Sequence, residues 1–246
     1  MMKDFLLKYI GKKGIKELSL FISFLIFYKI SRYIAIGDAE TAFENARKLI
    51  AFEKKIGIFT EPIVQDYFSS KFSLIKFLNT FYMYAHIPAT VMFFVWLFKK
   101  YNDKYYWIRN GFIVANCISI IFFIFYPCAP PRMLPEYGFV DTLLKISNVN
   151  LYSGFFSGLF NQYAAVPSMH FGNAFLIAIS IIVYMKRSYK WLTLIYPLFV
   201  LLVIVITANH FYLDAILGGL IVITPYPLMC IISNLTQYKI VVVKRC

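Results

Sequence analysis

Metal-binding and disulfide patterns are missing from this sequence. Its 246 residues include only four cysteines and three histidines. The cysteines have no CxxC spacing and form no His-Cys cluster, so we expect no metal site and no disulfide framework. They are interpreted as small apolar residues. No segment has the composition of a linker either, and we therefore expect a single domain over residues 1–246.

Apolar residues, by contrast, are abundant. Hydrophobic residues make up 60% of the chain and aromatic residues 20%, and the mean hydropathy is +0.67. Soluble domains are nearer half apolar, and uncharged apolar runs of about 20 residues are typical of membrane-spanning helices. Six runs approach this length: 18–36, 73–98, 107–127, 167–185, 191–208 and 209–233. The sequence predicts an all-α, polytopic membrane protein with a six-helix transmembrane bundle.

The first run has two interpretations. A basic start followed by an apolar stretch is typical of a signal peptide as well as of a first span. We favour a retained span, because the stretch from Leu18 to Gly37 is long enough to cross a bilayer.

The segment at 38–72 is polar and contains no apolar run of span length. Asp38 can cap a helix, and a second short helix is expected to begin at Pro62. The apolar residues of the first helix recur at helical spacing: Phe43, Ala46, Leu49 and Ile50. We therefore expect an amphipathic helix at the membrane surface, followed by a catalytic core over 73–233.

The net charge of +13 is unevenly distributed. With the N-terminus in the cytoplasm, the cytoplasmic segments hold 15 Lys and Arg residues with 3 acids, whereas the external segments hold 7 with 8 acids. The cytoplasmic segments are then 1–17, 99–109, 186–190 and 234–246, and the external ones 37–72 and 128–166. Basic residues crowd cytoplasmic loops, so this pattern predicts two cytoplasmic termini in a plasma-membrane protein and explains the charge without a nucleic-acid partner.

Two compact polar groups stand out within the apolar surroundings. Residues 167–170, Pro-Ser-Met-His, begin the fourth predicted span, and residues 209–214, Asn-His-Phe-Tyr-Leu-Asp, join the fifth to the sixth. By the predicted topology both groups lie at the external face. Titratable groups at membrane depth are costly, which makes them candidates for function.

His210 and Asp214 are four residues apart and share one face of a helix. A carboxylate at one imidazole nitrogen fixes the tautomer and stabilises the imidazolium that forms when the other nitrogen attacks. A buried His-Asp pair that only ties down a helix end is the alternative, and the spacing alone does not separate the two.

The other group supplies complementary chemistry. Pro167 at a helix start leaves Ser168 and its neighbours with free backbone N–H groups, which suit a phosphate oxygen. His170, in the first turn, can give a proton to a leaving oxygen. The alternative is a capped helix end with an incidental histidine.

Arg132 follows two adjacent prolines just outside the third span. Its guanidinium suits bidentate binding of phosphate, and the alternative is an interfacial arginine that pairs with lipid headgroups. His86 lies within the run 73–98 beside Pro88 with no partner group visible in the sequence, and we interpret it as structural.

These residues resemble a known family. Pro167-Ser168-Met169-His170 resembles the PSxH signature of the type 2 phosphatidic acid phosphatase superfamily, and His210 with Asp214 resembles its HxxxD signature. The resemblance implies a six-helix bundle in which His210 is the nucleophile that forms a phosphohistidine and Asp214 orients it. It further implies that His170 protonates the leaving group and that Ser168, Arg132 and Asn209 bind the substrate phosphate. Neither a metal nor any other cofactor is implied.

Two positions depart from the family pattern. The superfamily commonly has Lys seven residues before the Arg of its first motif and Arg six residues before the His of its last motif. Phe125 and Ile204 stand at these positions here. The Pro-Pro-Arg element and residues 209–214 look more like the branch of inositol phosphorylceramide synthases, whose members pass a phospho-headgroup between lipids.

The leading prediction is a lipid phosphatase or phosphotransferase that acts on a lipid phosphate at the external face. The implied substrates are phosphatidic acid, isoprenyl pyrophosphates and inositol or choline phospholipids. A transporter is a second hypothesis, but no inverted repeat is found and the histidines gather at one face. A non-enzymatic membrane protein with degenerate motifs is a third.

Overall fold

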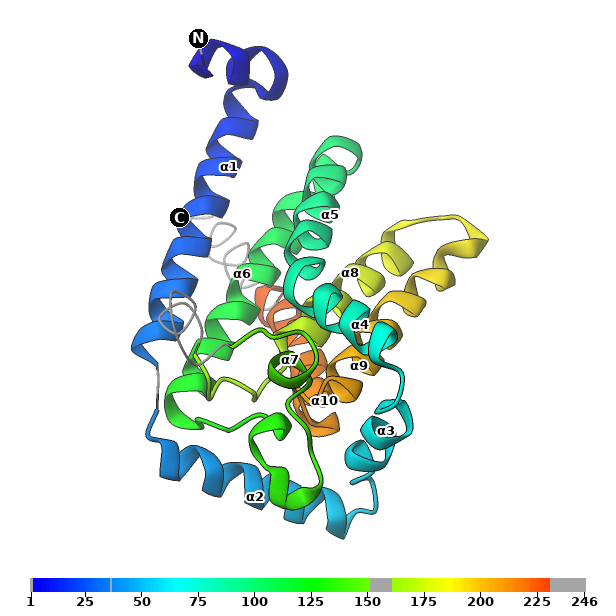
Figure 1. The fold of residues 1–246 in the computed structure, drawn as a ribbon. Coiled ribbons are helices and arrows are strands. Elements are labelled where there is room, and N and C mark those ends of the chain that lie inside the picture. Colours follow the sequence, from blue (N-terminus) through cyan, green and yellow to red (C-terminus); the bar gives the residue numbers. More distant parts are fainter. Residues whose placement is uncertain (1, 36, 151–160, 231–246) are drawn as a thin grey trace.

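Helices make up most of the chain (Figure 1). The computed structural model describes residues 2–35, 37–150 and 161–230. Within these ranges no strand is formed, and Cys128 pairs with Ala164 in one isolated bridge. The all-α class predicted from the sequence is confirmed.

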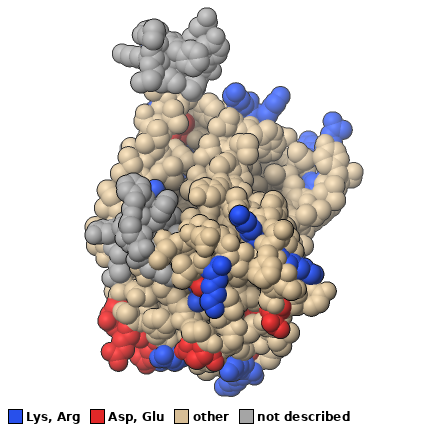
Figure 2. Space-filling view, in the orientation of Figure 1, with Lys and Arg blue, Asp and Glu red and all other residues tan. Residues whose placement is uncertain are grey.

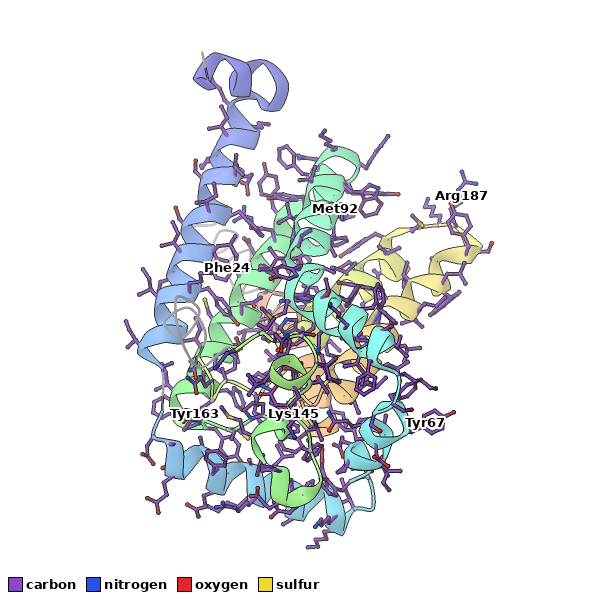
Figure 3. All side chains as sticks on the ribbon, in the orientation of Figure 1. Phe24, Tyr67, Met92, Lys145, Tyr163 and Arg187 are labelled. Atoms are coloured by element: carbon purple, nitrogen blue, oxygen red, sulfur yellow. The ribbon has the colours of Figure 1, made fainter. Side chains whose placement is uncertain are left out.

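The N-terminal helix α1 (Met2–Ile34) runs along one side of the bundle. It is kinked at Gly11, whose φ of +72° is a left-handed conformation that glycine adopts without strain. Further along, Phe24 packs edge-on against Phe112 with ring centroids 5.9 Å apart (Figure 3). This aromatic contact seats α1 against the helix that contains Phe112.

Helix α2 (Ala39–Lys55) lies across one end of the bundle, and α3 (Glu61–Phe68) follows it (Figure 1). Both predicted starts are confirmed, because Asp38 accepts a hydrogen bond from the backbone N–H of Thr41 and Pro62 lies in the first turn of α3. The apolar face of α2 is covered by protein, with the loop after the third predicted span packed against it. Its buried apolar residues are Ala42, Ala46, Leu49 and Ile50.

The predicted span at 73–98 is two helices rather than one. Helix α4 (Phe72–Tyr84) and helix α5 (His86–Lys100) meet at Ala85 with a bend of 50°. Pro88 explains the break, because it has no N–H to donate to the preceding turn and its ring crowds the carbonyl there. The bend sets His86 at the start of α5.

Helix α6 (Asn102–Phe125) leads into an irregular segment with two 3-10 turns, η1 (Pro131–Met133) and η2 (Pro135–Tyr137), and one turn of helix, α7 (Thr142–Lys145). Cys128 donates its N–H to the carbonyl of Tyr163 at 2.7 Å. This bond ties the start of the segment to the residues that precede Pro167.

The C-terminal half contains α8 (Met169–Tyr184), η4 (Ser188–Leu194), α9 (Ile195–Ile206) and α10 (Tyr212–Ile223). Helices α8 and α10 pack backbone to backbone. A Cβ added at Gly218 would lie 2.2 Å from the carbonyl oxygen of Ser168, so only glycine allows this approach. The seam fixes the start of α8 against the start of α10.

Three helices are long and apolar enough to cross a membrane within the described residues, namely Asn102–Phe125, Ser188–Ile206 and Tyr212–Cys230, and the bent pair α4–α5 makes a fourth. Helix α8 has only 16 residues. The chain is therefore a polytopic membrane protein, and the count of six spans remains a prediction.

Charged side chains differ between the two ends of the molecule. Figure 2 shows acidic side chains gathered together with basic ones at the end where α2 lies, whereas the side chains over the far ends of α5 and of the α8–α9 connection are basic. This asymmetry follows the charge pattern that predicts the topology.

Candidate active site

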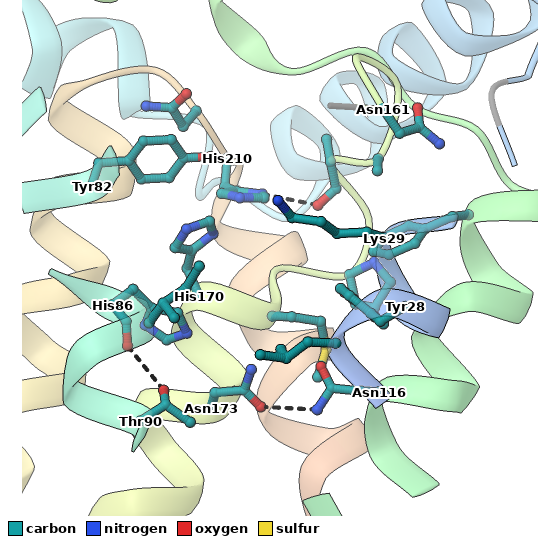
Figure 4. Close-up of a pocket in the computed structure, with 18 of the residues that line it drawn as sticks. Tyr28, Lys29, Tyr82, His86, Thr90, Asn116, Asn161, His170, Asn173 and His210 are labelled. Atoms are coloured by element: carbon teal, nitrogen blue, oxygen red, sulfur yellow. Dashed lines mark hydrogen bonds between the residues drawn. The ribbon is translucent and has the colours of Figure 1, made fainter. Parts of the chain in front are cut away.

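A cavity of about 420 Å³ lies within the bundle and is lined from α1, α4, α5, α6, α8 and the turn before α10 (Figure 4). Ligand sites usually have volumes of this order. All three histidines of the chain line it: His86, His170 and His210. Two of the three were predicted as site residues.

The three imidazole rings form a row. The ring centroid of His170 lies 5.9 Å from that of His210 and 4.8 Å from that of His86. Tyr82 of α4 stacks on His170 with a centroid distance of 4.4 Å. His86, which the sequence analysis interprets as structural, lies against His170 at the cavity, because the bend at Ala85 turns it in that direction. The sequence gives no local signal for this contact.

The His210 ring is held at its Nδ1 atom. Nδ1 lies 2.9 Å from the carbonyl oxygen of Ala165 and 3.3 Å from Oδ2 of Asp214. A carbonyl oxygen can only accept, so Nδ1 carries the proton. The other ring nitrogen, Nε2, then keeps its electron pair and is available for attack on an electrophile.

Asp214 is fully buried in the first turn of α10. Its Oδ2 also accepts the backbone N–H of Phe211 at 3.0 Å, which is one half of a capping box. The helix end and the imidazole are thus fixed by one carboxylate oxygen. The predicted contact between His210 and Asp214 is present, but His210 lies two residues before α10 rather than on the same helix face.

Ser168 lies behind the cavity rather than on it. Its side chain is fully buried, and its backbone N–H donates to the carbonyl oxygen of Asp214 at 2.9 Å. The sequence predicts a free N–H group at Ser168, and the structure shows instead that this group is already hydrogen-bonded. The N–H groups of Met169 and His170 still belong to the first turn of α8, where N–H groups have no acceptor within the helix.

Arg132 lines the cavity and is held from three sides. Its backbone N–H donates to the carbonyl oxygen of Ala208 at 2.8 Å, its guanidinium donates to Oδ1 of Asn209, and its Nε lies 4.0 Å from Oδ2 of Asp141. Asn209 in turn donates to Oγ1 of Thr207 at 2.7 Å. Asn209 therefore orients Arg132, and both residues line the cavity together with His210.

Lys29 of α1 is a second cation at the cavity. Figure 4 shows its amine directed toward His210. In the sequence, Lys29 lies within the first apolar run, 18–36, where no motif marks it as a site residue. The two departures from the family pattern lie elsewhere, since the Phe125 side chain is 80% exposed and Ile204 is fully buried. Lys29 and Arg132 are the charged residues among those that line the cavity.

Two buried glutamate side chains hold the start of α10. Oε1 of Glu53 accepts the backbone N–H of Leu213 at 2.9 Å, and Oε1 of Glu61 accepts that of Tyr212 at 3.0 Å. Burial, followed by the neighbouring Glu61 carboxyl, raises the pKa of Glu53 to about 9. These acids of α2 and α3 were not recognised from the sequence, where they resemble ordinary polar residues of a surface helix.

The structure thus brings His170, His210, Arg132 and Asn209 to one cavity. Asp214 contacts His210, and Ser168 is buried outside the cavity lining. Among the residues that the structure describes, no group of three or more His, Cys, Asp or Glu side chains is arranged to hold a metal ion. A sequence model of the PAP2 superfamily matches residues 47–228. No curated protein and no solved structure matched the chain.

Proposed function

Because the chain belongs to the PAP2 (type 2 phosphatidic acid phosphatase) superfamily, we propose that it cleaves or transfers the phosphate of a membrane lipid through a phosphohistidine on His210. Phosphatase-type chemistry is what the family supports, and the lipid substrate and the intermediate are our proposal. The observation that carries it is the His210 ring, whose Nδ1–H is held by Ala165 and Asp214 while Nε2 is left to attack.

The first step is attack of Nε2 on the phosphorus. The P–O bond to the leaving group breaks as the N–P bond forms, and positive charge develops on the imidazole. The buried carboxylate of Asp214 stabilises that charge at the opposite nitrogen. His170, whose ring lies 5.9 Å from that of His210, gives its proton to the leaving oxygen.

Two cations at the same end of the cavity suit the phosphate. Negative charge is spread over the phosphoryl oxygens in the transition state, and fixed positive groups stabilise it strongly in a site shielded from water. Arg132 is pre-oriented by Asn209, and Lys29 supplies a second charge from α1. The family commonly has Lys and Arg at the positions of Phe125 and Ile204. In this chain, Arg132 and Lys29 supply the positive charge in their place.

The rest of the cavity suits a lipid. Apolar side chains line much of it: Phe21, Phe24, Leu25, Met83, Ile87, Phe112 and Phe123. They come from α1, α4, α5 and α6, so the cavity lies between membrane-embedded helices. Such walls bind acyl or isoprenyl chains by the hydrophobic effect and leave the phosphate at the polar end.

The test is capture of the intermediate. Detergent-purified protein is incubated with phosphatidic acid labelled with ³²P, quenched at alkaline pH, where phosphohistidine survives, and separated on a denaturing gel. We expect label on the wild-type protein and none on His210→Ala. Equal labelling or equal phosphate release by a folded, monodisperse His210→Ala preparation would refute the proposal.

A further inference from the structure

Beyond the phosphate end, the neutral polar side chains that line the cavity include His86, Asn116 and Asn173. Their exposed fractions are 9%, 3% and 8%. Figure 4 shows His210 toward one end of the cavity and the two asparagines toward the other, with His86 and His170 between them. This group is called the amide end of the cavity below.

His86 has unused hydrogen-bonding capacity. Within the described part of the chain, neither Nδ1 nor Nε2 of its ring has a hydrogen-bond partner. Its backbone carbonyl is satisfied by Oγ1 of Thr90 at 3.0 Å, so the residue is well anchored. A buried donor and acceptor without partners cost free energy in a protein interior, and the cost is offset when a ligand or water supplies the missing bonds.

The two asparagines are partly satisfied. Nδ2 of Asn116 donates to the carbonyl oxygen of Phe112 at 2.8 Å and to Oδ1 of Asn173 at 3.3 Å. This pairing leaves the Nδ2 group of Asn173 as a donor and Oδ1 of Asn116 as an acceptor. The pairing also fixes both amides, so these two groups are presented in a defined arrangement.

The available groups select a class of ligand. Donors and acceptors occur together at the amide end, and the charged lining residues, Lys29 and Arg132, belong to the opposite part of the cavity near His210. An anion bound at the amide end would meet hydrogen-bond donors but no positively charged side chain to balance its charge. A hydroxyl group both donates and accepts, and it matches such a mixed, neutral set.

We propose that His86, Asn116 and Asn173 form a subsite for a neutral hydroxyl-bearing group, which serves as the acceptor alcohol of a phosphotransfer reaction. The proposal rests on the function proposed above. The position of His170 supports it, because its ring lies between that of His210 and that of His86. An alcohol bound at the amide end is thereby placed beside the residue that handles the proton.

The reaction balances as follows. The acceptor hydroxyl gives its proton to the imidazole of His170, which lost its own proton to the leaving group in the first step. The acceptor oxygen forms a bond to phosphorus as the P–N bond to His210 breaks. The electron pair of that bond returns to Nε2 of His210, and the product is a phosphate ester of the acceptor.

The experiment measures partition between alcohol and water. Wild type and three variants, Asn116→Leu, Asn173→Leu and His86→Phe, are given ³²P-labelled phosphatidic acid with glycerol, myo-inositol or dioctanoylglycerol as acceptor. Transferred and released phosphate are both counted. His86→Phe keeps a ring against His170 and removes only the nitrogens. Ser180→Ala is the matched control, because it removes a buried polar group from the same helix as Asn173 without touching the cavity.

We expect the ratio of transfer to hydrolysis to fall about tenfold for each lost hydrogen-bonding group, and to be unchanged in Ser180→Ala. A second arm uses labelled phosphatidylinositol as donor. A raised KM for this donor relative to phosphatidic acid in the same variants would assign the hydroxyls to the donor headgroup and still support the subsite.

Unchanged transfer ratios in the first arm together with an unchanged relative KM in the second would overturn the proposal. A wild type that transfers to none of the acceptors and does not discriminate between the donors would overturn it as well. Phosphohistidine formation is followed in the same samples. If the wild type forms none, the function proposed above fails; if it forms normally and the ratios do not move, the subsite alone is wrong.

Discussion

The carbonyl oxygen of Ala165 lies closer to Nδ1 of His210 than Asp214 does, at 2.9 Å against 3.3 Å. The backbone therefore sets the imidazole tautomer, and Asp214 is left with a different task. Asp214 is fully buried, and its carboxylate stabilises the positive charge that forms on the His210 ring during attack.

This division of labour predicts the effect of Asp214→Asn. The tautomer is retained, because Ala165 still accepts from Nδ1, but the charge stabilisation is lost. We expect kcat for phosphate release to fall by about 10²-fold, less than for His210→Ala. Rapid-quench measurement of phosphohistidine formation checks this, and a wild-type rate in Asp214→Asn would remove Asp214 from the chemistry.

Arg132 is expected to be sensitive even to lysine. A guanidinium can bond Asn209 and phosphate at once, whereas an ammonium keeps the charge without the planar fork. We expect kcat/KM on phosphatidic acid to fall roughly tenfold or more in Arg132→Lys and further in Arg132→Ala. Near-normal activity of Arg132→Lys would instead mean that the residue only anchors its loop.

Glu53 makes stability depend on pH. Its pKa of about 9 in the folded protein lies above the value near 4.5 of a solvated glutamic acid, so the folded state binds the additional proton between these values. Stability therefore decreases as pH rises through this window. Glu53→Gln can still accept from Leu213 but does not titrate, and we expect its Tm to vary less between pH 5 and pH 9. Identical pH slopes for the two proteins would contradict the assignment.

The seam between α8 and α10 predicts a contrast between neighbouring glycines. A Cβ at Gly218 would meet the carbonyl oxygen of Ser168 at 2.2 Å, whereas one at Gly219 would meet Phe171 and Phe175 side chains at 3.3 Å and beyond. We expect Gly218→Ala to lose about 1–3 kcal/mol of stability or more. The matched control Gly219→Ala should lose much less. Thermal melting in detergent measures both losses of stability. Equal losses for the two variants would show that the backbones of α8 and α10 can move apart.

The charge pattern predicts which face is external. We expect a cysteine introduced at position 150, in a background without the native cysteines, to react with a membrane-impermeant thiol reagent from outside intact cells. Cysteines introduced at position 187 should react only after permeabilisation. Labelling of position 150 from the cytoplasmic side alone would reverse the predicted topology.

The sequence predicts most of the polar site but not its full extent. His210 and Asp214 are recognisable because they are only four residues apart, and the chain that enters α10 brings them together. His170 is recognisable because it follows a helix start. Lys29 and His86 are not, because each reaches the cavity through tertiary structure: Lys29 through the packing of α1, and His86 through the bend at Ala85. The bend itself is not visible in the apolar pattern, since the apolar run is continuous where the helix is broken.

Glu53 and Glu61 bear on how separable the parts of this protein are. The residues from 73 onward contain both sequence signatures, yet the first N–H groups of α10 find their acceptors on α2 and α3. A fragment that began at residue 73 would leave these donors buried and unpaired within two residues of Asp214, at a cost of about 1–3 kcal/mol each. Helices α2 and α3 therefore cannot be separated from the rest of the bundle. An exchange of N-terminal segments between relatives would have to preserve Glu53 and Glu61, which belong to neither sequence signature.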